Sequence, residues 1–507
     1  MRALLLLLIC LRGISGQRPT LPLDEITTTT SSSISYSIPG NNHTPLSLTF
    51  ALCSSSGNTP RVSISNTGND DHQPDTDHDS HEVIFGHGLA TFSSHFTLGG
   101  ILTIDNPSGL SLEIGLSSSS PIHQTNLHLP VLGDTTSSQA ILFSYPVVPF
   151  SIKYPFNPSV PSFPNYTFPA ANMSQPPLPQ DATQNNISLI ILPTSSSSDI
   201  PQTGCYLSSQ SSAGTPMSPT LWARDSSGFS FQYFISDLSP QTNYTAFLIS
   251  STPTVRSTSG PIYFTTKSSS FPCTLAHSLP FCPSISYAIP LDAPPASPTF
   301  NFSSYTSQNL PSSITSPLLS YLANFTTVLS TFACGRETYS PIVTCTDCEL
   351  EYRKWLCAIS FPRCSEPPPS LASSWSPAPP DPSATGLPPQ QNPLSLQHSS
   401  PLPALLPLLP SNAPPRNPFF PTNLSQSIST AYTILPCIEQ CYAVDRSCPP
   451  FLKFKCPSPR SNARFSYALG YIDKIESDGR HGGSKGKGKG RTGEAQDRWG
   501  NVWCLML

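Results

Sequence analysis

Cysteine is the residue type whose number and spacing could do the most chemistry in this chain. The protein has 507 residues and 15 cysteines. Ten of them lie in the last third of the sequence, namely Cys334, Cys345, Cys348, Cys357, Cys364, Cys437, Cys441, Cys448, Cys456 and Cys504. An even number of closely spaced cysteines is typical of a disulfide framework in an oxidising compartment. We therefore predict five bridges among these ten residues, in a pairing that the sequence leaves open.

Cys345 and Cys348 form a Cys-x-x-Cys motif, which has other chemical uses. A redox pair usually lies in a thioredoxin-like βαβ context, and the surrounding sequence pattern does not predict one. Half of a zinc site is a further alternative. The even and dispersed cysteine count favours structural bridges over both.

Four other cysteines lie in the first 300 residues beyond the leader. Cys53 and Cys205 could form one long-range bridge. Cys273 and Cys282 are nine residues apart and would close a small loop. With these four, all fourteen cysteines that follow Cys10 are predicted to be in disulfides.

Residues 69–95 contain a second group of side chains that could bind cations. The group consists of Asp70, Asp71, His72, Asp75, Asp77, His78, Asp79, His81 and His87. Their spacing does not fit an EF-hand loop, which needs a glycine at its sixth position and a glutamate at its twelfth. A hydrated acidic loop is the favoured interpretation, and we assign no metal or other cofactor.

The sequence contains no motif that predicts catalysis. It has no Gly-x-Ser-x-Gly, no His-Glu-x-x-His and no glycine-rich phosphate loop. A formal net charge of −4 argues against binding to nucleic acid. We therefore expect a protein that is not an enzyme, and we identify no small-molecule substrate.

Three stretches around the cysteines resemble a known family. They are CGRETYSPIVTCTDCELEYRKWLCAISFPRC at 334–364, PCIEQCYAVDRSCPPFLKFKCP at 436–457 and AQDRWGNVWC at 495–504. In cysteine spacing and in flanking residues they are similar to the fungal Mid family of stretch-activated, calcium-permeable channel components. The N-terminal half resembles that family only in its general style.

This resemblance implies a glycosylated regulatory subunit that binds the extracellular face of a pore-forming, four-repeat calcium channel. The subunit would support stress- or stretch-activated calcium influx, and it would associate with the membrane through that partner. Its expected location is the secretory pathway and the extracellular face of the plasma membrane, with the endoplasmic reticulum as a second site. The alternative is a secreted, cell-wall-associated glycoprotein or ligand-binding receptor module with no channel role.

The helices and strands that must position these cysteines are predicted to form an α+β protein of several domains. Residues 1–16 have the charged start and apolar core of a signal peptide. Residues 17–275 contain short β-branched and aromatic runs between turn residues, which predicts one or two β-sandwich-like modules. Residues 276–330 are a connector and a helix, with an apolar stripe of Leu318, Leu322, Phe325, Leu329 and Phe332.

Residues 331–507 are expected to form the cysteine-rich domain. Its ten cysteines on short helices resemble the Frizzled-type fold and the auxiliary subunits of animal sodium-leak channels, which implies a mainly helical domain. A helix is predicted at 347–359, with Thr346 and Glu349 as a capping box and Pro362 at its end. The proline- and serine-rich residues 365–425 are predicted to be a disordered insertion, because they cannot form a packed core.

Beyond the leader, no stretch reaches the roughly 18 apolar residues of a spanning helix, so we expect a lumenal or extracellular chain. Eight Asn-x-Ser/Thr sequons predict N-glycosylation, at Asn42, Asn165, Asn172, Asn186, Asn243, Asn301, Asn324 and Asn423.

Partner contacts are expected where polar residues lie beside cysteines and off the apolar stripes. The candidates are Arg336, Glu337, Tyr339, Asp445 and Arg446. The alternative for each of them is an internal role in helix capping or a salt bridge.

Overall fold

The computed structural model folds into two compact units. The first consists of Met1–Leu129, Thr183–Ala213 and Thr245–Ile262, and the second of Pro130–Ala182, Gly214–Tyr244 and Tyr263–Leu507. These units cut across the predicted boundary at residue 275. The structure describes residues 18–41, 44–55, 58–66, 80–126, 128–149, 163–173, 187–197, 200–225, 227–252, 255–295, 304–366, 405–407, 428, 431–457, 466–468 and 504–507.

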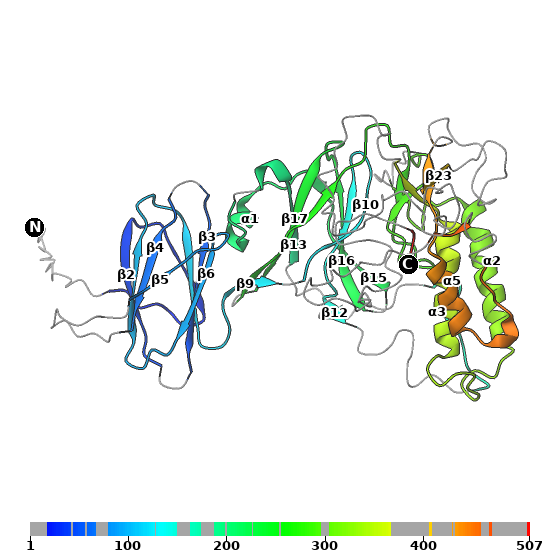
Figure 1. Cartoon of the computed structure of the whole chain (residues 1–507), viewed down its shortest axis with the longest axis horizontal. Coiled ribbons are helices and arrows are strands. Elements are labelled where there is room, and N and C mark those ends of the chain that lie inside the picture. The colour runs from blue at the N-terminus through cyan, green and yellow to red at the C-terminus, as the bar shows by residue number, and fades with distance from the viewer. Residues whose placement is uncertain are drawn as a thin grey trace, which may run out of the picture. The chain divides into compact units, whose positions relative to one another are not determined.

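The first unit begins with a β-sandwich of two antiparallel four-stranded sheets (Figure 1). One sheet has the order β1-β8-β3-β6 and the other the order β2-β7-β4-β5. The strands are β1 (Glu25–Thr29), β2 (Ser33–Ile38), β3 (Leu46–Leu52), β4 (Arg61–Ser65), β5 (Ser80–Val83), β6 (Leu89–Ser94), β7 (Gly100–Asp105) and β8 (Leu112–Ser117). This confirms the predicted β-sandwich at the N-terminal end of the chain.

The alternation of apolar and polar residues along each strand decides which face of the strand packs into the core of the sandwich. In β4, Val62 and Ile64 are fully buried while Arg61 is exposed, as expected for side chains that point to opposite faces of a pleated strand. Leu102 and Ile104 of β7 lie on the same buried face, opposite Ile64 and Val62 in the strand register. Together with Phe50 of β3, they form one continuous core.

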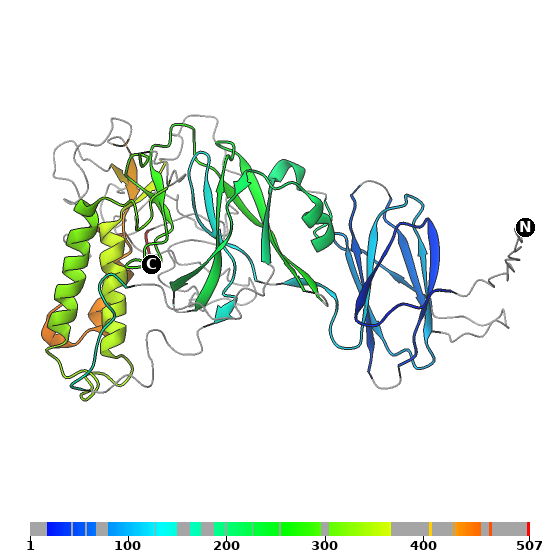
Figure 2. The same ribbon diagram turned by 180° about the vertical axis from the view of Figure 1, so that it is seen from behind.

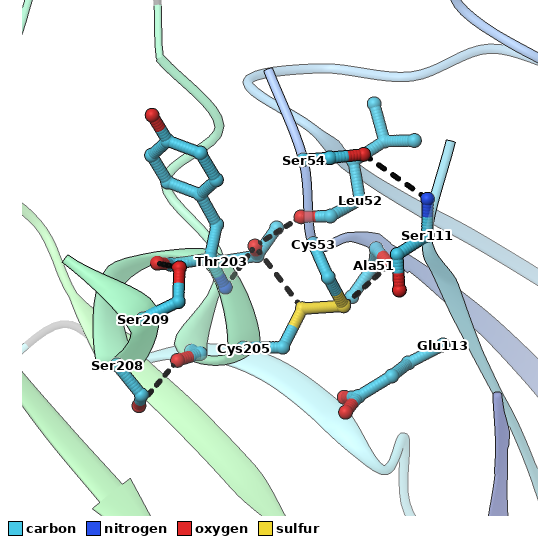
Figure 3. Close-up of a disulfide and its surroundings, with 12 residues drawn as sticks. Ala51, Leu52, Cys53, Ser54, Ser111, Glu113, Thr203, Cys205, Ser208 and Ser209 are labelled. Carbon is cyan, nitrogen blue, oxygen red and sulfur yellow. Dashed lines mark hydrogen bonds between the residues drawn. A yellow bond between two sulfur atoms is a disulfide. The ribbon is translucent and has the colours of Figure 1, made fainter. Parts of the chain in front are cut away.

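The same unit contains a further sheet of order β13-β17-β18-β9 and one short helix. The elements are β9 (His123–Asn126), β13 (Ile187–Pro193), β17 (Asn243–Ser251), β18 (Arg256–Ser259) and α1 (Gly204–Ser209). The predicted bridge between Cys53, which follows β3, and Cys205 of α1 is present (Figure 3). Beside it, the hydroxyl of Thr203 donates to the carbonyl oxygen of Leu52 at 2.5 Å, so the helix is held covalently and by a hydrogen bond.

A buried charge network lies next to this bridge. The carboxylate of Glu113 pairs with Arg256 and lies 3.1 Å from Nε2 of His123. Nδ1 of His123 is 2.9 Å from the hydroxyl of Thr49 in β3. These contacts connect β3, β8, β9 and β18, and they satisfy polar groups that would be costly to bury alone.

The second unit has a six-stranded sheet of order β10-β11-β16-β12, with β14 and β15 also paired to β16. Its strands are β10 (Val131–Thr135), β11 (Ala140–Phe143), β12 (Val148–Pro149), β14 (Thr215–Pro216), β15 (Thr220–Asp225) and β16 (Gly228–Ser236). The remaining strands are β19 (Ile262–Thr265), β20 (Thr274–Ala276), β21 (Tyr287–Ile289), β22 (Arg363–Ser365), β23 (Leu405–Pro407) and β24 (Tyr432–Ile434). The hairpin β20-β21 and the sheet β22-β24-β23 are separate small sheets.

Three helices of this unit lie side by side in both views (Figures 1 and 2). They are α2 (Ser312–Leu329), α3 (Cys345–Ser360) and α5 (Ile438–Ser447). This unit also has a short 3-10 turn, η4 (Pro450–Leu452), while η2 (Thr194–Ser196) belongs to the first unit. The predicted stripe of α2 is confirmed, because Leu318, Leu322 and Leu329 are buried. Phe325 stacks on Tyr352 of α3 with ring centroids 3.6 Å apart.

The helix predicted at 347–359 exists, but its capping box was placed two residues too late. Thr344 is the N-cap, and it forms a reciprocal capping box with Asp347. Glu349, the residue assigned to the predicted box, turns into the core instead and pairs with Arg353.

The mainly helical, Frizzled-like domain is not supported, because the described chain is mostly β-sheet. The cysteine-rich region also packs on β structure that precedes it. Asp134 of β10 accepts hydrogen bonds from Arg363 Nε of β22 at 3.0 Å and from the amide of Ala288 in β21 at 3.2 Å. Burial alone would raise the pKa of Asp134, but Arg363 and then Lys267 outweigh it and hold that pKa below its usual range.

The predicted disordered insertion at 365–425 needs a similar correction. Leu405–Pro407 forms β23, which pairs antiparallel with β24. Residues 367–404 and 408–425 lie outside the described residues. The insertion therefore contributes at least one strand to the fold.

All fourteen described cysteines are paired, in seven disulfides. The bridges are Cys53–Cys205, Cys273–Cys364, Cys282–Cys357, Cys334–Cys345, Cys348–Cys448, Cys437–Cys504 and Cys441–Cys456. The predicted small loop between Cys273 and Cys282 is wrong, and so is the prediction of five bridges confined to the last ten cysteines. Cys357 and Cys364 reach back to Cys282 and Cys273, because β20, β21 and α3 share one core.

Arg353 is the largest of the fully buried side chains. Its guanidinium lies 2.7 Å from the carboxylate of Glu349, one helical turn earlier. The guanidinium also donates to the carbonyl oxygens of Ala171 at 2.9 Å, Phe281 at 3.3 Å and Ala170 at 3.3 Å. Burial raises the pKa of the Glu349 carboxyl, and the charge of Arg353 opposes that rise. Removing either side chain would leave the other one buried without a charged partner.

The disulfide pattern makes a direct prediction for peptide mapping. Digestion of unreduced protein should yield the Cys273–Cys364 and Cys282–Cys357 pairs in separate linked peptides. A Cys282→Ser variant should leave Cys357 as a free thiol that alkylation detects, while Cys273 stays bridged. A peptide in which Cys273 is linked to Cys282 would contradict the structure.

The buried ion pair predicts an unequal response of two neighbouring residues. Arg353→Met should destabilise the protein by about 3–5 kcal/mol, because it leaves Glu349 buried without a partner. Lys354→Met is the matched control, since Lys354 pairs with Glu351 where both side chains are partly exposed, and it should cost about 0–1 kcal/mol. Urea unfolding measures both, and equal losses would show that Arg353 does not stabilise the core.

Candidate functional site

The five predicted partner contacts lie near the first turn of α3 and the last turn of α5. The Cys334–Cys345 bridge closes a short loop that leads into α3. Cys348 in the first turn of α3 is bridged to Cys448, the C-cap of α5. Two disulfides therefore fix this end of the helices.

Tyr339 attaches the loop to α5. Its hydroxyl lies 2.7 Å from the carbonyl oxygens of both Thr344 and Ser447, so its proton is donated inside the fold. Its ring packs edge-on against Phe332 at 5.4 Å. Burial raises the pKa of this hydroxyl well above its usual value, and the tyrosine stays neutral. The predicted contact residue is thus half-buried and has a positioning role.

Arg336 and Glu337 are both exposed on this loop. They pair with each other at 2.7 Å, with side chains 60% and 55% exposed, so the pair adds little stability in water. The guanidinium of Arg336 also lies over the ring of Phe163, 4.6 Å from its centroid. Both charges remain accessible to a partner.

Asp445 and Arg446 lie in the last turns of α5. Asp445 pairs with Lys455 at 3.0 Å, where Lys455 is 79% exposed. Arg446 is exposed and close to the helix C-terminus, where a positive charge is favourable. The carbonyl oxygen of Ser447, the residue after Arg446, accepts the hydrogen bond from Tyr339, and Asp445 pairs with Lys455.

Two apolar residues of this region were missed by the sequence reasoning. Ile342, inside the Cys334–Cys345 loop, is 87% exposed, and Phe451 is 45% exposed. Phe451 stacks on Phe332 with centroids 6.1 Å apart. The sequence does contain a signal for Ile342. It is a large apolar residue between two closely spaced cysteines, and a short loop closed by a disulfide has little freedom to turn such a side chain inward.

Four of the eight predicted glycosylation sites lie in the described residues, and all four are exposed: Asn165, Asn172, Asn243 and Asn324. Asn42, Asn186, Asn301 and Asn423 lie outside those residues. Exposure is what an attached glycan requires.

The candidate metal ligands give no open site in the described part of the chain. One grouping of Cys53, Glu113 and Cys205 and one of Cys437, Glu439 and Cys504 bring three donor residues close together. In each, the two sulfurs are joined in a disulfide, so they cannot ligate as thiolates. Of the Asp/His cluster at 69–95, only His81 and His87 are described, and the others lie outside the described residues.

Among the residues that the structure describes, none of the helices is long and apolar enough to cross a bilayer.

These features define a disulfide-stabilised, mostly β-sheet protein with exposed glycosylation sequons. Residues 47–479 match the model of the Mid1 family, described as the stretch-activated Ca²⁺-permeable channel component, and the chain belongs to this family. The resemblance proposed from the cysteine blocks is therefore confirmed.

Three fungal relatives agree with this assignment. The chain is 32% identical over 447 residues to the stretch-activated cation channel MID1 of Cryptococcus neoformans, an alignment that covers 83% of this chain and 66% of that protein. It is 27% identical to MID1 of Saccharomyces cerevisiae, over 45% of this chain and 35% of that protein. It is also 27% identical to yam8 of Schizosaccharomyces pombe, over 46% of this chain and 40% of that protein. The chain thus spans less than two thirds of the length of each relative.

Among solved structures, the FN1–FN3 domains of chicken CNTN1 match 50% of this chain and 69% of theirs. The sequence identity is 8% and the TM-score is 0.16, which is too low to inform the fold.

The internal role of Tyr339 can be tested by removing one oxygen atom. Tyr339→Phe should lower the free energy of unfolding by about 1–3 kcal/mol, because the two carbonyl oxygens lose a buried donor. Tyr263→Phe, on an exposed ring of β19, is the control and should be close to neutral. An unchanged urea midpoint for Tyr339→Phe would show that its hydroxyl is free for a partner.

Proposed function

We propose that this protein is a glycosylated regulatory subunit of a plasma-membrane calcium channel that supports stress- or stretch-activated calcium influx. Its place is the extracellular face, reached through the secretory pathway and the endoplasmic reticulum. The observation that carries this proposal is membership of the Mid1 family over residues 47–479. The seven disulfides and the exposed sequons support an oxidising, extracytoplasmic environment.

The contact surface that we propose is the Cys334–Cys345 loop together with the end of α5. Disulfides and the Tyr339 hydroxyl hold this surface, so a partner would bind it with little loss of conformational entropy. Ile342 supplies an exposed apolar side chain, and Arg336 and Arg446 supply exposed positive charges. Interfaces typically surround a few apolar or arginine anchors with weaker polar contacts.

The partner that fits this proposal is a pore-forming, four-repeat calcium channel subunit, which would also connect this protein to the membrane. The positive charges of Arg336 and Arg446 favour acidic loops on the partner's extracellular side, since complementary charge raises association rates and selects partners.

The test combines substitutions on this surface with matched substitutions elsewhere. Ile342→Asp and Arg446→Glu should each reduce co-purification with the pore subunit by about tenfold or more, and should lower stimulated calcium uptake in parallel, as expected for interface anchors. Ile84→Asp is the control for the first, because Ile84 is 86% exposed in the other unit. Arg61→Glu, at an exposed position of β4, is the control for the second.

Surface delivery must be measured for every variant, by labelling of intact cells. If delivered variants all keep both the complex and the uptake, the interface lies elsewhere on the protein. If the unsubstituted protein leaves the membrane on washing and never co-purifies with a channel, the alternative of a wall-associated glycoprotein is correct.

A further inference from the structure

The segment Phe163–Met173 lies on the cysteine-rich helices, although the nearest described elements before and after it in the chain are β-strands. It follows β12, which ends at Pro149, and precedes β13, which begins at Ile187. The segment itself contains no helix or strand. It contacts α3, the loop before α3, and the buried cluster that contains Phe281.

The segment has one docked face and one exposed face. Tyr166 and Phe168 are half-buried, and both pack on the cluster that contains Cys345, Cys348 and Val444. Asn165 and Thr167, which alternate with them, are exposed. This period of two is typical of an extended peptide that lies against a surface.

Polar contacts fix the two ends of the docked segment. The hydroxyl of Tyr166 lies 2.6 Å from the hydroxyl of Thr346, which is in the first turn of α3. Arg353 donates from its two terminal nitrogens to the carbonyl oxygens of Ala170 and Ala171. At the other end, the ring of Phe163 lies under the guanidinium of Arg336.

We propose that α3 and the Cys334–Cys345 loop form a peptide-binding site, and that Phe163–Met173 is its internal, exchangeable ligand. The site fits an extended peptide with aromatic side chains at alternate positions, followed by two small residues whose carbonyl oxygens face Arg353. This site shares the Cys334–Cys345 loop and Arg336 with the proposed contact surface, but the inference does not rest on the proposed channel role.

Tethering explains how such a ligand stays bound without being part of a sheet. Thirteen residues precede the segment after β12 and thirteen follow it before β13. Because the segment is covalently joined to the rest of the chain on both sides, its binding is intramolecular, and a weak intrinsic affinity is enough to keep the site filled. A free peptide of the same pattern, at a high enough concentration, would therefore compete.

The exposed face of the segment carries two of the sequons, at Asn165 and Asn172. Both side chains are exposed while their neighbours are docked. Glycans at these positions would extend away from α3, so the docked state is compatible with glycosylation and the experiment can use the glycosylated chain.

The experiment cuts the tether on both sides in the full-length protein. Specific protease sites are inserted between residues 155 and 156 and between residues 178 and 179. The probe is a fluorescent synthetic peptide with the sequence of residues 163–173. After cleavage and dilution, the internal fragment should dissociate. The labelled peptide should then bind saturably, one per protein, and be displaced by unlabelled peptide.

Matched peptide variants separate the docked face from the exposed face. Phe168→Ala should raise the dissociation constant about tenfold or more, because it removes a half-buried ring. Tyr166→Phe should raise it about two- to tenfold through loss of one hydrogen bond. Thr167→Ser is the control on the exposed face and should change it less than about twofold, since surface substitutions are usually neutral.

Three results would overturn the proposal. In the first, the cut protein unfolds or its urea midpoint collapses, so the segment belongs to the core. In the second, the fragment stays bound through prolonged dilution and no labelled peptide enters. In the third, the labelled peptide binds equally well with Phe168→Ala and with Thr167→Ser, which would mean that binding is not specific to the docked face.

Discussion

The burial of Arg353 is the constraint on which the second unit depends. A guanidinium that is removed from water must have all its donors satisfied, and no single element supplies enough acceptors. Glu349 provides one from α3 itself, Phe281 provides one from the turn beside Cys282, and the Phe163–Met173 segment provides two. One side chain therefore binds two distant stretches of sequence to the same helix. Where the Phe163–Met173 segment is exchanged, the incoming peptide would supply its two carbonyl acceptors.

Two disulfides also hold distant stretches of sequence together in this unit. Cys282–Cys357 holds the turn at Phe281 next to α3, and Cys273–Cys364 joins the β20 hairpin to β22. Both close long loops, which in the chain-entropy account destabilise the unfolded state most. The cysteine-rich helices are for this reason an extension of a β core rather than an independent helical domain. A third bridge, Cys334–Cys345, closes the loop in which Ile342 is exposed.

Much of the local structure could be predicted from the sequence. The strands β8, β13, β16 and β17 follow from β-branched and aromatic runs between turn residues. The buried stripe of α2 follows from its helical spacing, since these patterns depend only on near neighbours. The capping box was misplaced because Thr344–Asp347 and Thr346–Glu349 have the same spacing. Only the burial of Glu349 distinguishes them.

The sequence by itself determined the family, through cysteine spacing and flanking residues, and it determined that these cysteines form bridges. Tertiary structure alone decided which cysteines pair, because pairing depends on which Cα atoms come within about 4.4–6.8 Å after the chain has packed. It also decided that Tyr339 is anchored while Ile342 is exposed, and that residues 163–173 return to α3. No local pattern encodes these facts, since the bridges join cysteines that are 11 to 152 residues apart. The contacts of Tyr339 with Ser447 and of Ala171 with Arg353 span 108 and 182 residues.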